Sequence, residues 1–227
     1  MNIYAISAAI NLIIFLFVGG VIWRRGEDRR LVNALGLFSL TLAIWSLGYI
    51  FWQLSTSGPQ ALFWSRMLMM GAIFVTITFV HFTLVFLNKT NKYKGLLYGG
   101  YGLMTFFGIA NYTDYFVSGV KEILFFPYWP QPGILFHPFL AIWFFYAGFG
   151  IYLLYRAYAT ADEETQNKIW YLLIAIVITY VGGGVNYLLW YGIKIPPVST
   201  VSVSLFQILV AYAIAKHQLF NMKVIIT

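Results

Sequence analysis

Few side chains in this chain of 227 residues could take part in chemistry, and Arg66 stands out because a long apolar segment surrounds it. The guanidinium group of an arginine can hold a ligand carboxylate or phosphate through two parallel hydrogen bonds. The same group can instead make an internal tie to Asp114 or to a backbone carbonyl, or extend its charged end toward water. The sequence leaves these interpretations open.

The three histidines are spread along the chain and do not suggest a metal or haem site. His81 lies near the end of one apolar segment, His137 opens another, and His217 follows the last one. His81 and His137 lie at opposite depths of the bundle, so they cannot both ligate one haem. The chain has no cysteine, which excludes thiolate ligands, disulfides and thiol nucleophiles. We therefore expect no metal ion and no cofactor.

A bound retinal is also disfavoured, because it needs a lysine near the middle of the last apolar segment to form a Schiff base. The lysines after Pro197 are Lys216 and Lys223, which stand at or beyond the end of that segment. Asp114 and Glu122 are the acids of the longest connection, and the apolar segments show no paired carboxylates and no Ser, His and Asp combination. The sequence predicts no catalytic site in this region.

Small and polar residues in the last two apolar segments are candidates for binding a ligand. Thr200, Ser204 and Gln207 follow one another at helical spacing, which places them on one face of the last segment. In the segment before it, a run of three glycines at 182–184 is followed by Asn186. Such residues are also common where membrane helices pack together, so packing is the competing interpretation.

The strongest candidate site is a cluster of aromatic and polar residues that the predicted elements bring to one depth. An aromatic cavity with a few polar groups is the usual form of a small-molecule pocket. Aromatic residues also form belts at membrane surfaces, which is the alternative interpretation. The predicted ligand-binding residues are Trp52, Arg66, Met70, Trp129, His137, Asn186 and Trp190, with Ser204 and Gln207 from the last segment.

The composition requires a membrane environment for these residues. Hydrophobic residues make up 61% of the chain and charged residues only 9%, against about a quarter in average soluble domains. Aromatic residues make up 20%, the formal net charge is +7 and the mean hydropathy is +0.78. So few charges cannot cover a globule of this size in water, and the sequence therefore predicts an integral membrane protein.

Seven apolar segments approach the length of about 20 residues that a spanning helix needs. The sequence therefore predicts an all-α bundle of seven transmembrane helices, in which short connections place sequential helices side by side. The fourth segment is short, and the seventh follows a proline pair that suits a helix start. The predicted helices are Ile3–Trp23, Leu31–Leu54, Ala61–Leu87, Gly95–Ala110, Ile134–Tyr158, Ile169–Tyr191 and Val198–Ala215.

The basic residues predict the orientation of this bundle. Eleven of the 14 lysines and arginines fall in segments on one side, and Arg66, Lys121 and Lys194 lie toward the other. By the positive-inside rule, the N-terminus lies outside and the C-terminus lies in the cytoplasm of a multi-pass plasma-membrane protein. The basic cluster follows the first segment, which is wrong for a signal peptide.

Two connections have features of their own. The outer one, from Asn111 to about Gly133, contains two extended runs with a break between them, which predict a short β-hairpin between the fourth and fifth helices. An interfacial amphipathic segment would have a similar composition. The connection before the sixth helix is predicted as a polar turn, Ala159–Asn167, whose acids suit the N-terminus of the helix that follows.

The chain finishes on an apolar stretch, Met222–Thr227, that an exposed tail would not carry unless it packed against something. We therefore expect a transmembrane domain over 1–215 and the start of a linker to a cytoplasmic domain over 216–227. The segment Ala211–Thr227 resembles the N-terminal seven-transmembrane region of bacterial and archaeal histidine kinases, and so do Leu62–Arg66 in the third helix, Gly133–His137 before the fifth and Leu188–Pro197 before the seventh.

The resemblance implies a membrane sensor, working as a homodimer, that signals through its last helix to a PAS, GAF, kinase or cyclase domain in the same chain. Lys216 and Lys223 would lie on the transmitting segment. This sequence itself carries no phosphoacceptor or ATP-binding domain, so we do not expect it to be an enzyme. The expected partners are membrane lipid, a small or lipid-like ligand and the output domain, and not nucleic acid.

Two other classes of function remain open from the sequence. A small transporter or channel would need a water-accessible path past Ser204 and Gln207 to both faces of the membrane. Such proteins more often show inverted repeats and charged or broken helices at the midplane. A structural membrane subunit would show the outer aromatic cluster packed solid, without a cavity.

Overall fold

The computed structural model describes residues 3–197, 203 and 209, and this part of the chain folds into six α-helices and one β-hairpin. The first six predicted helices are present, and all except the sixth begin and end within three residues of their predicted bounds. The elements are α1 (Ile3–Arg25), α2 (Arg29–Gln53), α3 (Gly58–Phe86), α4 (Lys94–Ala110), β1 (Val117–Ile123), β2 (Phe126–Pro132), α5 (Phe136–Tyr158) and α6 (Glu163–Trp190).

Among the described helices, α1, α2, α3, α5 and α6 are long and apolar enough to cross a membrane. The helix α4 has 17 residues, which is about 26 Å of helix against a hydrocarbon core of about 30 Å. The predicted seventh helix, Val198–Ala215, lies outside the described residues apart from Val203 and Leu209. Seven spans and their orientation therefore stay predictions.

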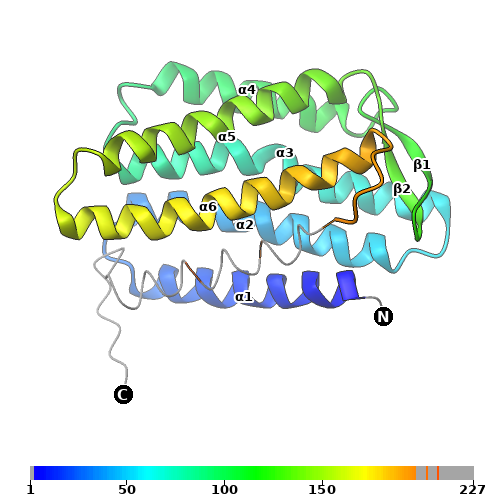
Figure 1. Cartoon of the computed structure of the whole chain (residues 1–227), viewed down its shortest axis with the longest axis horizontal. Coiled ribbons are helices and arrows are strands. Elements are labelled where there is room, and N and C mark those ends of the chain that lie inside the picture. The colour runs from blue at the N-terminus through cyan, green and yellow to red at the C-terminus, as the bar shows by residue number, and fades with distance from the viewer. Residues whose placement is uncertain (1–2, 198–202, 204–208, 210–227) are drawn as a thin grey trace.

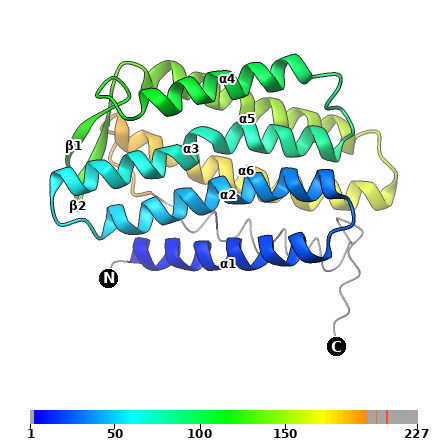
Figure 2. The same ribbon diagram turned by 180° about the vertical axis from the view of Figure 1, so that it is seen from behind.

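The helices run side by side along the long axis of the molecule (Figure 1). The central helix, α3, packs against α2, α4 and α5, while α1 lies at the edge of the bundle beside α2 (Figure 2). The hairpin stands at the end of the bundle where α2, α4 and α6 finish and where α1 begins (Figure 1). This placement follows from the alternating direction of successive helices, as the short connections predict.

The start of α6 corrects the predicted polar turn over Ala159–Asn167, because the helix already begins at Glu163. Two acids occupy its first turn, where negative charge is favourable. One of them, Glu164, accepts a hydrogen bond from Lys168 Nζ at 2.7 Å, four residues further along. Such pairs stabilise a helix by a few tenths of a kcal/mol, which explains why polar residues extend this helix beyond its apolar span.

The hairpin predicted between the fourth and fifth helices is confirmed. Its strands β1 and β2 pair antiparallel, with Val117 opposite Pro132 and Lys121 opposite Trp129. Proline residues recur along β2, and they are tolerated because each strand of a two-stranded sheet keeps one free edge. The register brings Trp129 to a buried position beneath the sheet.

The helices α2 and α3 approach so closely that their backbones touch at two glycines. A Cβ atom on Gly48 would lie 2.4 Å from the backbone nitrogen of Leu68, and one on Gly71 would lie 2.5 Å from the backbone nitrogen of Trp45. Close approach through small residues is a common way for membrane helices to associate, since lipid provides no hydrophobic drive for it. The two glycines therefore set the distance between α2 and α3.

We expect Gly71→Ala to lower the stability of the bundle, because the added methyl group meets backbone atoms that cannot turn aside. Overpacking of this kind costs about 1–3 kcal/mol. Thermal unfolding in detergent micelles measures the loss. The matched control is Gly36→Ala, at a position on α2 with open space around it, which should leave the midpoint unchanged or slightly raised. Equal midpoints for the two variants would contradict the close contact.

Candidate functional site

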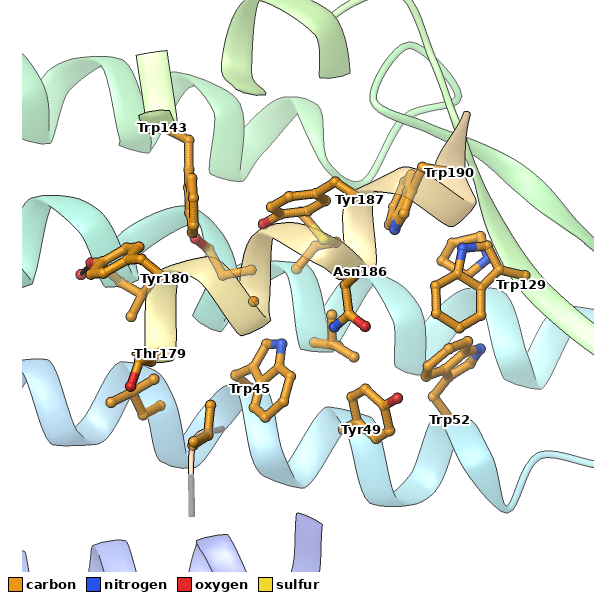
Figure 3. A pocket seen from close by; sticks show the side chains of 18 of the residues that line it. Trp45, Tyr49, Trp52, Trp129, Trp143, Thr179, Tyr180, Asn186, Tyr187 and Trp190 are labelled. Atoms are coloured by element: carbon orange, nitrogen blue, oxygen red, sulfur yellow. Dashed lines mark hydrogen bonds between the residues drawn. The ribbon is translucent and has the colours of Figure 1, made fainter. Parts of the chain in front are cut away.

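A cavity of about 70 Å³ lies between α2, α3, α6 and the hairpin strand β2. The side chains around it come from elements far apart in the chain, and most of those labelled in Figure 3 are aromatic. The predicted outer cluster is therefore hollow and not packed solid. Its aromatic walls include Trp45, Tyr49, Trp52, Trp129, Tyr187 and Trp190.

Helical spacing explains why α2 and α6 each present several residues to the cavity. On α2 the wall residues Trp45, Tyr49 and Trp52 recur every three or four positions. On α6 the residues Thr179, Gly183, Asn186 and Trp190 recur in the same way. Such spacing places side chains on one face of a helix. Figure 3 shows these two faces turned toward each other across the cavity.

Two pairs of aromatic rings in the wall meet edge to face. The Trp52 and Trp129 ring centroids are 5.0 Å apart at 71°, and those of Tyr49 and Trp52 are 5.1 Å apart at 86°. This is a favourable geometry for aromatic pairs, worth about 0.5–1.5 kcal/mol beyond the area that they bury. The three rings therefore support one another along this side of the cavity.

One hydrogen-bond donor of the wall has no acceptor. The Trp129 side chain is 1% exposed, and its Nε1 makes no hydrogen bond within the part of the chain that the structure describes. By contrast, Trp52 Nε1 donates to the backbone oxygen of Tyr128 at 2.7 Å. A buried donor without an acceptor costs about 1–3 kcal/mol. The wall of the cavity therefore contains a buried donor whose hydrogen bond is not made, and an acceptor that reached it would satisfy it.

The cavity carries no ionised group in the wall that the described residues form. Its polar side chains are uncharged, and one of them, Thr179, already donates to the backbone oxygen of Ala175 at 2.8 Å. A charged ligand would find no partner of opposite charge there, and a buried unpaired charge is very costly. The lining therefore favours a neutral molecule.

The predicted ligand-binding residues separate into two groups. The cavity wall contains Trp52, Trp129, Asn186 and Trp190. It does not contain Arg66, Met70 or His137, and Ser204 and Gln207 lie outside the described residues. A role in binding a ligand stays a prediction for all of these residues.

Arg66 makes the internal tie to Asp114 and to a backbone carbonyl, which is one of the interpretations that the sequence leaves open. One guanidinium nitrogen, Nη2, donates to Asp114 Oδ1 at 2.9 Å and to the backbone oxygen of Val117 at 3.0 Å. The buried side chain of Asn111 in turn donates to the backbone oxygen of Arg66 at 2.7 Å. These bonds join α3 to the end of α4 and to the start of β1, and so hold the hairpin over the bundle.

Met70 and His137 also have contacts outside the cavity. The Cε atom of Met70 lies 3.6 Å from the position that a Cβ on Gly108 would take, so the side chain points toward α4. His137 Nδ1 lies 2.7 Å from the hydroxyl oxygen of Tyr191, a contact that joins the start of α5 to the end of α6. In the described part of the chain, no three His, Asp or Glu side chains gather in a way that could hold a metal ion.

Sequence reasoning missed several of the aromatic residues that line the wall. Trp45, Tyr49, Trp143, Tyr180 and Tyr187 all line the cavity. The signal that could have found them is aromatic spacing along α2 and α6. The prediction rests instead on polar residues in apolar helices and on the aromatic residues expected at the same depth, and these five residues belong to neither group.

The family model described as the N-terminal 7TM region of histidine kinase matches residues 6–223 of the chain. The match covers all the described elements except the first residues of α1. No curated protein and no solved structure matches the chain.

We expect Arg66→Met to loosen the hairpin, because it leaves Asp114 and the backbone oxygen of Val117 without their common donor. Hydrogen exchange of the backbone amides over 117–132 should rise about fivefold, the equivalent of about 1 kcal/mol of lost hydrogen bonding. Lys121→Met is the control, since it removes an exposed positive charge from β1 itself. Equal exchange in both variants would show that Arg66 does not hold the hairpin.

Proposed function

The chain belongs to the family of N-terminal seven-transmembrane regions of histidine kinases, and we propose that it is the membrane sensor of such a signalling protein. In this proposal it detects a small or hydrophobic ligand in the aromatic cavity. The occupied cavity then changes the position of the last helix, which continues into a cytoplasmic output domain in the same chain. The described part of the chain contains no catalytic site in this proposal, and the output domain supplies the activity.

The observation that carries this proposal is the position of Val203 in the cavity wall. Val203 is 4% exposed and lies within the segment 198–215 that the sequence predicts as the last helix. A ligand that contacts α2, α3, α6 and the hairpin therefore also contacts the segment that leads to the C-terminal end of the region. Lys216 and Lys223, beyond the described residues, would pass the change on.

The physical mechanism is a shift between two arrangements of the helices. A ligand can shift such an equilibrium only by the difference between its affinities for the two states. Rigid aromatic walls favour such a difference, because a small displacement of one wall changes the free volume and the contacts of everything inside. The homodimer, the surrounding lipid, and the outer N-terminus and cytoplasmic C-terminus belong to the same proposal.

A small transporter or channel is less well supported. It would need a polar path through the bundle, whereas the cavity wall that the described residues form is aromatic and carries no ionised group. Ser204 and Gln207, on which such a path was expected to depend, lie outside the described residues.

Filling the cavity with a side chain tests the sensor proposal without knowledge of the ligand. Gly183 lines the cavity and has no atom within 4 Å of the position that its Cβ would take. We expect Gly183→Leu in the full-length protein to act as a permanent occupant. Autophosphorylation in membrane vesicles should change at least about threefold from the wild-type basal level, in whichever direction occupancy drives the output.

The matched control is Gly102→Leu, which adds the same side chain at an exposed position of α4 with open space around it. Thermal unfolding of both variants shows that each is folded. If Gly183→Leu and Gly102→Leu both keep the wild-type basal output, the cavity is not coupled to the output domain and the sensor proposal fails.

A further inference from the structure

A second hollow lies on the opposite face of α6 from the cavity. This hollow, here called the groove, runs between α5 and α6 and has a volume of about 430 Å³. Its lining is apolar and includes Phe144 and Val181, which are 51% and 64% exposed. Both helices are candidate membrane spans, so the groove opens toward the hydrocarbon of the bilayer.

The groove and the cavity share two wall residues, Trp143 of α5 and Tyr180 of α6. Their ring centroids are 5.0 Å apart at 61°. The two rings therefore form the partition between a space that faces lipid and the cavity inside the bundle. Two neighbouring glycines of α6 lie on different sides of this partition, because Gly183 lines the cavity and Gly184 lines the groove.

Each of the two rings of this partition makes one hydrogen bond to α3, besides ring contacts of Tyr180 with Phe79 and of Trp143 with Tyr187. Trp143 Nε1 donates to the backbone oxygen of Ala72 at 3.1 Å, and the Tyr180 hydroxyl donates to the backbone oxygen of Val75 at 3.3 Å. Both acceptors are carbonyls within a helix, which the helical hydrogen bonds already engage. When a ring swings aside, it therefore gives up one hydrogen bond and leaves no carbonyl of α3 without a partner.

The hairpin side of the cavity is held by more contacts. There Trp52 Nε1 bonds the backbone of β2, the Tyr128 hydroxyl donates to the backbone oxygen of Thr56, and Arg66 ties α3 to β1. Opening this side would break several bonds from two helices together. The partition toward the groove therefore has fewer hydrogen bonds to break than the hairpin side.

We infer that the cavity takes its ligand from the bilayer, through the groove and between Trp143 and Tyr180. This inference rests on the proposed sensor function and specifies the ligand class. The ligand is a neutral, membrane-dissolved molecule that carries a hydrogen-bond acceptor such as a carbonyl or ether oxygen. The neutral lining favours an uncharged ligand, and the apolar groove favours one that dissolves in the membrane. The unpaired Nε1 of Trp129 favours a ligand with a hydrogen-bond acceptor.

Tryptophan quenching by a bromine-containing probe tests both the ligand class and the route. The probe is para-bromoacetophenone, dissolved in phosphatidylcholine nanodiscs that contain the full chain. Trp23 and Trp170 are 59% and 49% exposed and should be quenched within the mixing time. The tryptophans of the cavity should be quenched in a slower phase that saturates with probe concentration. If wild-type protein shows no saturable phase, the inferred ligand class is wrong.

The route is tested by placing a side chain in the groove. Gly184 and Gly148 line the groove, and neither has an atom within 3.4 Å of the position of an added Cβ. We expect Gly184→Leu to slow association and dissociation of the probe by about tenfold each, which leaves its dissociation constant within about twofold of wild type. Gly148→Leu should do the same from α5, and Gly102→Leu on α4 should change neither rate.

A variant of the partition provides a second measurement that does not depend on added bulk. Tyr180→Phe removes the hydroxyl that bonds the backbone of Val75, so both rates should rise about fivefold. If the saturable phase is present but neither the groove variants nor Tyr180→Phe alter its rates, the probe enters elsewhere and the lateral route is wrong. The sensor proposal would survive that outcome, because it is judged by the output of Gly183→Leu.

The acceptor is tested with para-bromoethylbenzene, which has nearly the same shape as the first probe but lacks the carbonyl. Wild-type protein should hold para-bromoacetophenone about tenfold more tightly, after correction for the partition of each probe into lipid. Trp129→Phe should remove this preference. If the preference persists in Trp129→Phe, the acceptor part of the inference fails.

Discussion

The backbone contact between α2 and α3 is the constraint on which the rest of the bundle depends. Gly48 and Gly71 allow the two helices to touch, and this contact fixes where Trp45 and its neighbours on α2 stand. The opposite wall of the cavity depends on α3, because Trp143 and Tyr180 donate hydrogen bonds to backbone oxygens of α3. In a solvent as apolar as the side chains, close packing and such bonds have to hold the helices together.

The same interactions explain why a cavity survives in the middle of a tightly packed bundle. Trp52, Trp143 and Tyr180 turn their polar atoms away from the cavity and toward backbone oxygens of β2 and α3. These bonds hold the rings in edge-to-face contacts that keep their planes apart. A ring that is held at its polar end has to give up this hydrogen bond before it can rotate into the space beside it. The hydrogen bonds that stabilise the walls therefore also keep the cavity open.

Much of this fold could be predicted from the sequence, because helix length and the extended, proline-rich runs of the hairpin are local signals. The start of α6 at Glu163 was missed because the prediction followed hydropathy alone, while the helix continues into polar residues that stabilise it by charge. The close approach of α2 and α3 could not be predicted. It depends on which face of α2 lies against Gly71 of α3, and the sequence does not specify this.

The site was harder to predict than the fold, because polar residues in apolar helices, and the aromatic residues expected at the same depth, mark only part of it. The search for polar residues found Asn186, but it also selected Arg66, whose guanidinium is engaged by Asp114 and the backbone of Val117. The residues that enclose the cavity are aromatic, and no single one of them is unusual in a membrane helix. Only their spacing along α2 and α6 marks them. Which faces of these two helices meet depends on the tertiary structure, so the sequence pattern alone does not predict it.

A cavity with such walls can discriminate between ligands in two unequal ways. Apolar walls distinguish molecules by volume and shape, and one methylene group more or less is worth only about 1–3 kcal/mol. A buried donor discriminates more strongly, since a molecule without an acceptor leaves the donor unpaired. In the inferred mode of binding, the aromatic walls would set the size of the ligand, and the buried Nε1 of Trp129 would set its chemistry. A membrane holds many apolar molecules at high concentration, so a sensor that samples the bilayer depends on the second kind of discrimination.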